Sequence, residues 1–246
     1  MLFRSNKAVK DKSVGQEAIE SVLRQIIQVK VIGKEAAIEK VQLETDEKEE
    51  ADYRAKTVFD SISAKDKQTQ GIELKVLSKI FEENKLAQKM YNVQMGKLKI
   101  DYAANTLSAA KVELIYQAAN AKNKETVKNT MSQILSEVTS SQNSFYTVAK
   151  NKTQADAIEY VIGNQDSRTN LAKAVVSLKK NQTSALIEEK DGFYIAHCIQ
   201  TNSAALQQQY RNQLVSEKQT ESFQKTYKIW SDKFDVKVSK ALLAAN

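Results

Sequence analysis

The N-terminal part of the chain carries apolar residues at the spacing of an α-helix. Between Val14 and about Lys40 these residues form one stripe, because positions three and four apart share a face of a helix. The residues of the stripe are Ile19, Val22, Leu23, Ile26 and Ile27. The pattern predicts one long amphipathic helix.

Two further helices are predicted before residue 100. Acidic residues crowd the segment after Leu43 and favour the first turn of a helix there, with Thr45 as its N-cap. This helix is expected to run from Asp46 to about Ser61. A polar break from Ser63 to Gly71 separates it from a third apolar face that ends near Gly96. The residues of that face are Val76, Leu77, Ile80, Phe81, Ala87, Met90 and Tyr91.

The middle of the chain changes to the β-branched and aromatic composition that is typical of strands. The segments with this composition are Lys111–Tyr116, Ala157–Ile162 and Phe193–Ile199. Asp191-Gly192 is the strongest hairpin signal, because a tight turn needs a positive φ that glycine adopts readily. Helical spacing returns in residues 124–138 and 170–178. This order of elements predicts a compact α+β domain with three or four strands.

The C-terminal region returns to helix and is rich in aromatic residues. From about Ala204 to Lys233 apolar side chains recur mostly every three or four residues. They are Tyr210, Leu214, Phe223, Tyr227, Trp230 and Phe234. A short closing strand is predicted at residues 235–238. Because an apolar helix face must be buried, we expect this helix to dock onto residues 14–96. The predicted fold class is therefore α+β, with a helical lobe built from N- and C-terminal helices around an inserted α/β domain.

The composition excludes several kinds of site. The 246 residues are 41% hydrophobic and 27% charged, as is typical of a folded globular protein. With one cysteine, Cys198, and one histidine, His197, the chain can form neither an internal disulfide nor a Cys/His zinc site. Neighbours in a strand point to opposite faces, so these two residues are not a catalytic pair either. The chain also lacks a glycine-rich nucleotide motif. We predict no metal and no cofactor.

The charge distribution bears on the partners. The formal net charge is +7 at pH 7, and it is spread thinly along the chain. Nucleic-acid binders usually gather their cations, with interleaved aromatic residues, on one face. We therefore predict no nucleic-acid partner, and only a mild attraction to anionic polymers or lipid headgroups.

Four stretches of the chain together carry a family resemblance. They are Ile26–Ile32 with the acidic helix start after it; Phe59–Ser63 with Lys67-Gln68, Gly71-Ile72 and Leu86–Tyr91; Ala174–Ser184 with Asp191–Ile195; and Phe223–Trp230 with Asp235–Val238. On these stretches the chain resembles the extracytoplasmic foldases of the PrsA and SurA type, in which a helical chaperone lobe surrounds a parvulin-like peptidyl-prolyl cis-trans isomerase (rotamase) domain. The resemblance implies a helical chaperone lobe in residues 1–107, a parvulin-like domain in 108–201, and a C-terminal helix in 202–246 that completes the lobe.

The chain departs from the family at the catalytic positions. Leu114 and Tyr194 stand where the two family histidines are expected, and Ser167 and Leu171 stand at the positions of the pocket methionine and phenylalanine. Prolyl isomerisation has a barrier of about 18–20 kcal/mol, and lowering it calls for an oriented donor in a poorly hydrated pocket. We therefore assign no catalytic residue and expect little or no isomerase activity. The alternative is an active isomerase in which the Tyr194 hydroxyl is the donor.

The resemblance implies two peptide-binding surfaces. In the parvulin-like domain the candidate residues are Leu114, Tyr116, Tyr160, Leu171, Val176 and Tyr194. In the helical lobe they are Tyr53, Phe59, Met90, Tyr91 and Trp230. Against this reading, aromatic residues and methionines at helical spacing are more often core residues than binding surface.

The resemblance also implies partners and a location. The partners would be unfolded or extended polypeptide clients, in the cell envelope or secreted, although we expect no signal peptide from residues 1–7. The family segment that precedes Val14 is missing, so we expect a fragment or a shortened relative. Whether the chain forms a homodimer is left open. A further alternative is a structural or adhesive helical surface protein without clients.

Overall fold

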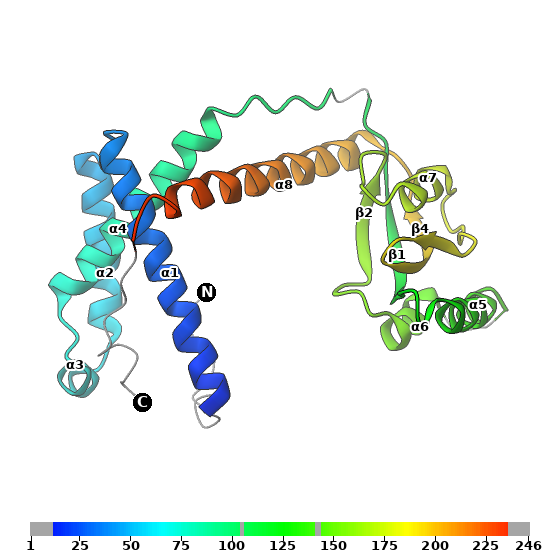
Figure 1. The fold of residues 1–246 in the computed structure, drawn as a ribbon, viewed down its shortest axis with the longest axis horizontal. Coiled ribbons are helices and arrows are strands. Elements are labelled where there is room, and N and C mark those ends of the chain that lie inside the picture. The colour runs from blue at the N-terminus through cyan, green and yellow to red at the C-terminus, as the bar shows by residue number, and fades with distance from the viewer. Residues whose placement is uncertain (1–11, 104–105, 141–143, 236–246) are drawn as a thin grey trace. The chain divides into compact units, whose positions relative to one another are not determined.

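The computed structural model describes residues 12–103, 106–140 and 144–235. It divides into two compact units (Figure 1). The helical unit consists of residues 1–99 and 219–246, and the sheet unit consists of residues 100–218. These divisions differ from the predicted boundaries at 107/108 and 201/202. The physical reason is that Leu107 and two residues of the last helix, Tyr210 and Leu214, are buried together in the sheet unit.

Four helices make up most of the helical unit. They are α1 (Lys12–Ile38), α2 (Thr45–Ser61), α3 (Ala64–Gln70) and α4 (Leu74–Gly96). Helix α4 packs against both α1 and α2, and the α2–α4 pair is seen side by side in Figure 1. The predicted helices from Val14, Asp46 and residue 76 onward are confirmed by α1, α2 and α4.

Two local predictions in this unit are wrong. The N-cap of α2 is Glu44 rather than Thr45, and the backbone N–H of Glu44 donates to the Glu47 carboxylate at 2.8 Å. The segment predicted as a polar break forms the short helix α3, because Ser63 caps its start by accepting from the Asp66 backbone N–H at 3.1 Å. Gly71 ends α3 in the left-handed conformation, with φ of 61°.

The core of the helical unit joins the two ends of the chain. Trp230 of α8 (Ala204–Ser231) is 4% exposed and packs in one buried cluster with residues of α1 and α4. The other buried members of the cluster are Val31, Ile32, Ala36, Ala87 and Met90. The Phe223 ring lies edge-on to Tyr91, with 4.8 Å between ring centroids. The predicted docking of the C-terminal helix is confirmed. The predicted closing strand lies outside the described residues except for Asp235.

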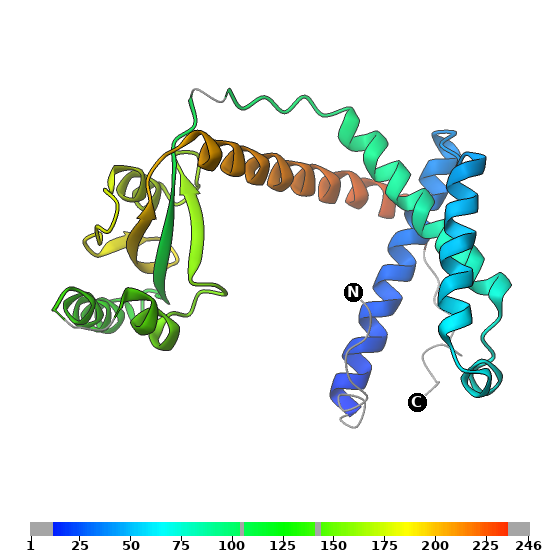
Figure 2. The same ribbon diagram turned by 180° about the vertical axis from the view of Figure 1, so that it is seen from behind.

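The sheet unit is built on four antiparallel strands in the order β2-β1-β4-β3. The strands are β1 (Ala109–Ala118), β2 (Glu159–Gly163), β3 (Ile187–Glu189) and β4 (Gly192–Gln200). The helices are α5 (Lys124–Ser140), α6 (Phe145–Lys152) and α7 (Thr169–Ser177). Seen from behind in Figure 2, α5 and α6 lie side by side. The predicted α+β class, with three or four strands and the β3–β4 hairpin, is confirmed.

Alternation along the strands puts a buried cluster on each face of the sheet, apart from the small cluster around Tyr210. Val112 and Leu114 of β1 pack with Leu171 and Val175 of α7. Ile115 of β1 packs on the other face with residues of α5 and α6. The hairpin turn requires its glycine, because a Cβ at Gly192 would lie 2.1 Å from the Gln117 carbonyl oxygen. Among the described residues, no helix is both long and apolar enough to cross a membrane.

Candidate functional site

Two tyrosines stack on the face of the sheet that α7 covers. Tyr116 of β1 and Tyr194 of β4 are direct cross-strand partners, with 4.7 Å between ring centroids. The Tyr194 hydroxyl donates to the Asp191 carboxylate at 2.6 Å, and the Tyr116 hydroxyl donates to the Asp191 backbone carbonyl at 3.0 Å. Burial raises the pKa of both phenols, and the bond to Asp191 raises the pKa of Tyr194 further. Both rings therefore stay protonated and act as hydrogen-bond donors.

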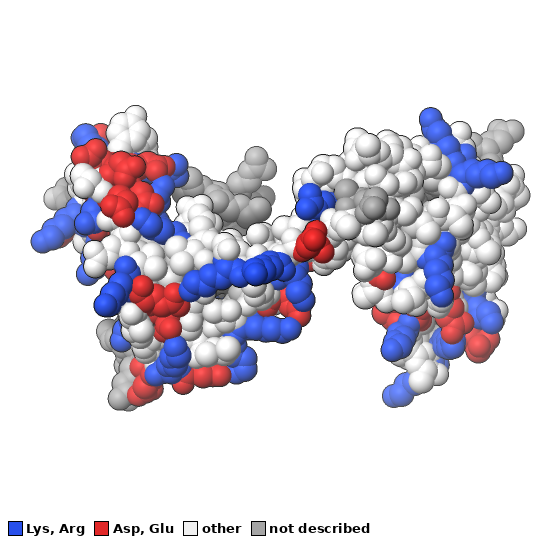
Figure 3. Space-filling model, turned by 90° about the horizontal axis from the view of Figure 1, so that it is seen from above, with Lys and Arg blue, Asp and Glu red and all other residues white. Residues whose placement is uncertain are grey.

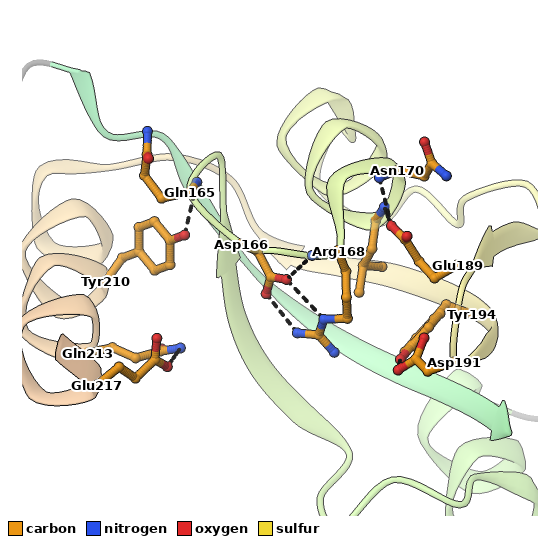
Figure 4. Close-up of polar contacts among 11 residues, drawn as sticks. Gln165, Asp166, Arg168, Asn170, Glu189, Asp191, Tyr194, Tyr210, Gln213 and Glu217 are labelled. Carbon is orange, nitrogen blue, oxygen red and sulfur yellow. Dashed lines mark hydrogen bonds and ion pairs between the residues drawn. The ribbon is translucent and has the colours of Figure 1, made fainter. Parts of the chain in front are cut away.

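A cation lies over the Tyr194 ring. The Arg168 guanidinium carbon is 5.6 Å from the ring centroid, within the range of a cation–π contact. The same guanidinium donates to the Asp166 carboxylate through Nε at 2.9 Å and Nη2 at 2.7 Å (Figure 4). These hydrogen bonds raise the pKa of Arg168 above its already high value. The guanidinium is therefore held in place by the Asp166 carboxylate, which is of opposite charge.

The predicted groove residues divide into interior and partly buried positions. Leu114, Leu171 and Tyr194 are interior residues of one cluster, and Tyr194 is only 2% exposed. Tyr116 and Tyr160 are partly buried and pack against that cluster. The last predicted residue, Val176, is also partly buried but is not part of the packing around the cluster.

Leu114 and Tyr194, the two positions that replace histidines in the resemblance, are not opposite each other. The cross-strand partner of Leu114 is Ala196, and the partner of Tyr194 is Tyr116. Leu114 and Tyr194 therefore share one face of the sheet at different rungs of the β1–β4 ladder.

A carboxylate from the hairpin holds the start of α7. The Glu189 carboxylate accepts from the backbone N–H groups of Asn170 and Leu171 at 2.7 and 2.9 Å (Figure 4). Beside it lies a pocket of about 540 Å³, bordered by Asn120 and by an ion pair of 2.6 Å between Lys124 and Glu188. Sequence reasoning missed this pocket and the Asp166–Arg168 pair. No local pattern marks the Glu189 contact, because Glu189 lies 18 residues beyond Leu171 at the start of α7.

The residues predicted for the helical lobe do not form one surface. Met90 and Trp230 are interior residues, and Tyr91 packs against Phe223. Phe59 is partly buried and lies 4.2 Å from the Lys67 ammonium. Tyr53 alone of the five is well exposed, at 73%.

An apolar groove in the helical unit was not anticipated as a site. It has a volume of about 460 Å³ and runs between α1 and α4, where Ile26 and Ile80 are 48% and 45% exposed. The Lys30–Glu83 ion pair, at 2.5 Å, lies on its border. The α1 stripe containing Ile26 was visible in the sequence, but its exposure depends on how far α4 covers it.

The described residues include no group of three or more His, Cys, Asp or Glu side chains placed to hold a metal ion. The prediction that His197 and Cys198 point to opposite faces is confirmed. Cys198 is buried in the cluster below α7, whereas the His197 ring stacks on Phe145 of α6 and hydrogen-bonds Thr183 at 2.9 Å.

A comparison with protein families identifies the class of the sheet unit. The rotamase family, described as the PPIC-type PPIASE domain, matches residues 107–200. Residues 107–200 therefore match the PPIC-type, or parvulin, family, and the prediction of a parvulin-like domain in this part of the chain is confirmed. The comparison with curated proteins finds no match.

Solved structures similar to this chain include foldases. The peptidylprolyl isomerase PrsA from Bacillus anthracis is 15% identical, with a TM-score of 0.46 and coverage of 89% of this chain and 99% of that one. A PpiC-type isomerase domain is 20% identical and covers 41% of this chain and 98% of its own, with a TM-score of 0.35. A SurA-like chaperone structure from Campylobacter jejuni is 10% identical and covers 90% and 87%, with a TM-score of 0.33.

Proposed function

We propose that this protein is an extracytoplasmic folding factor that binds unfolded secreted or cell-envelope polypeptides, and that its PPIC-type domain is a weak or inactive isomerase. In this proposal residues 1–107 and 202–246 form the client-binding lobe, and residues 108–201 provide a second peptide site. The placement outside the cytoplasm rests on the family resemblance. On the face shown in Figure 3, side chains of both signs are interspersed, which supports only a mild attraction to anionic envelope surfaces.

The packing at Leu114 and Tyr194 carries the proposal of weak catalysis. Both side chains are almost fully buried, and the Tyr194 hydroxyl already donates to Asp191. A donor that lowers the isomerisation barrier must reach the twisted amide of the substrate. A leucine cannot donate, and a buried phenol that is already bonded does not reach the substrate without rearrangement.

An active isomerase is the second candidate, and a specific observation favours it. Tyr116, Tyr194 and Arg168 bring two hydroxyl groups and a guanidinium to one place on the sheet. An isomerase assay with a proline-containing peptide separates the candidates. We expect the 246-residue chain to show little or no catalysis above the uncatalysed rate. Catalysis well above the uncatalysed rate would establish the second candidate if Tyr194→Phe abolishes it. The control variant Tyr146→Phe, at an exposed site of α6, should then keep the wild-type rate.

The α1–α4 groove supports client binding. It presents aliphatic side chains to solvent, and apolar surface bordered by polar groups is what an extended apolar segment needs. The assay measures how far the chain, at a stoichiometric ratio, suppresses the aggregation of a reduced, unfolded test protein. The double variant Ile26→Gln/Ile80→Gln should no longer suppress this aggregation. The control Ile229→Gln, on an exposed residue of α8 in the same unit, should still suppress it.

Two results of this assay contradict the proposal. Full suppression by the double variant would place client binding elsewhere. No suppression by the wild-type chain would favour the structural or adhesive alternative. Sedimentation of the chain alone, in the same buffer, distinguishes client binding from pairing of two copies through the groove.

A further inference from the structure

Tyr210 of α8 docks against the end of strand β2. Its side chain is 1% exposed and lies in a small cluster with Leu107, Ala109 and Leu214. The fit against β2 depends on Gly163, because a Cβ there would come within 2.4 Å of the Tyr210 ring. The two surfaces are therefore in direct contact, with no room for a larger side chain between them.

The hydroxyl of Tyr210 holds the loop that joins β2 to α7. It accepts a hydrogen bond from the Gln165 backbone N–H at 3.1 Å (Figure 4). Burial raises the pKa of Tyr210 to about 12, so this hydroxyl remains neutral near pH 7. Next to the bond, a pocket of about 340 Å³ separates α8 from the loop, between Asp166 and Arg168 on one side and Glu217 on the other. The Tyr210 hydroxyl therefore bridges α8 and the loop at Gln165.

The same loop carries the cation of the candidate peptide site. Asp166 directly follows Gln165, and its carboxylate accepts from the backbone and side-chain N–H groups of Arg168. Arg168 in turn lies over the Tyr194 ring. A shift of the loop at Gln165 would therefore move the guanidinium relative to Tyr194.

We propose that Tyr210 is a positioning residue for the peptide site: through Gln165 and Asp166 it sets the place of Arg168 over Tyr194. Tyr210 does not touch the peptide and acts through the loop. The ligand is an extended, proline-containing peptide, so the inference rests on the proposed function of this domain. Loss of the Tyr210 hydroxyl leaves the Gln165 N–H without its partner, whereas Asn164 and Asp166 keep their backbone bonds to Ser108 and Gly163. The loop is therefore released only at Gln165, and Arg168 and the geometry at Tyr194 shift with it.

The test uses the 246-residue chain with ¹³C-labelled tyrosine rings. Tyr210→Phe keeps the ring and removes only the hydroxyl. Tyr102→Phe is the matched control, since Tyr102 packs against the same cluster. The Tyr194 ring signal, assigned with Tyr194→Phe, should move in Tyr210→Phe and stay in place in the control. Arg168→Gln should move it too, and the double variant should add little to that shift.

Peptide affinity provides the second measurement. We expect Tyr210→Phe to weaken binding of a labelled proline-containing peptide about 2- to 10-fold, as for the loss of one hydrogen bond, and to have no further effect when Arg168 is glutamine. An unmoved Tyr194 signal overturns the inference. If wild-type protein binds no peptide while the signal does move, the proposed function of the domain fails and the positioning geometry stands.

Discussion

Replacing Met90 by alanine tests whether both ends of the chain share one interior. Met90 lies on α4 and is fully buried in the cluster that contains Trp230 of α8. Trp230 is the only tryptophan of the chain, so its fluorescence reports on the helical unit alone. The variant changes a residue from the N-terminal half of the chain, and the signal comes from the C-terminal helix.

The magnitude follows from the packing. Truncation of a fully buried methionine to alanine costs about 2–5 kcal/mol, which combines the lost transfer free energy with the cost of the cavity. For a urea dependence of about 2 kcal/mol per M, the midpoint of unfolding should fall by about 1–2.5 M. This is a large part of the free energy of unfolding of a typical domain, about 5–15 kcal/mol.

The assay is urea unfolding followed by tryptophan fluorescence. Tyr53→Ala, at an exposed position of α2, is the control and should change the free energy of unfolding by no more than about 0.5 kcal/mol. If Met90→Ala and Tyr53→Ala had the same urea midpoint by tryptophan fluorescence, Trp230 would not share a core with α4. The two-ended helical unit would then be refuted.

Four further predictions each concern a single position. Burial lowers the pKa of His197 below its unfolded value of about 6.5, so the native state binds fewer protons and the free energy of unfolding should fall as the pH drops below about 6.5. Urea midpoints at about pH 7.5 and 5.5, followed by circular dichroism, should show a smaller fall in His197→Gln, and an equal fall would contradict the assignment. Gly33→Ala should stabilise the helical unit by about 0.5–1 kcal/mol, since a Cβ there meets open space within α1. Gly71→Ala should destabilise it by about 1–2 kcal/mol because φ is 61°. Urea unfolding followed by tryptophan fluorescence measures both changes in the free energy of unfolding, and changes of the same sign would refute the backbone argument. Gly163→Ala should lower the stability of the sheet unit by about 1–3 kcal/mol by displacing Tyr210, and an unchanged midpoint by circular dichroism would show that the ring moves aside at no cost.

The periodicity of the chain determined most of its secondary structure. The α1 stripe, the β-branched segments at β1 and β4 and the Asp191-Gly192 turn depend on contacts a few residues apart, and each element formed where its pattern predicted it. The errors lie where two local tendencies compete. At α3, the polar composition suggested a break, but the Ser63 cap and Gly71 at the other end are enough to form a short helix.

Only the tertiary structure decided which residues face solvent and which meet. The same helical spacing that puts Met90 in the interior leaves Ile26 exposed, because spacing defines a face and the packing of other elements determines whether it is covered. The link from Tyr210 through Gln165 to Arg168 likewise joins residues more than forty positions apart in the chain. Such contacts depend on the chain path through the fold, and no local pattern of residues encodes that path.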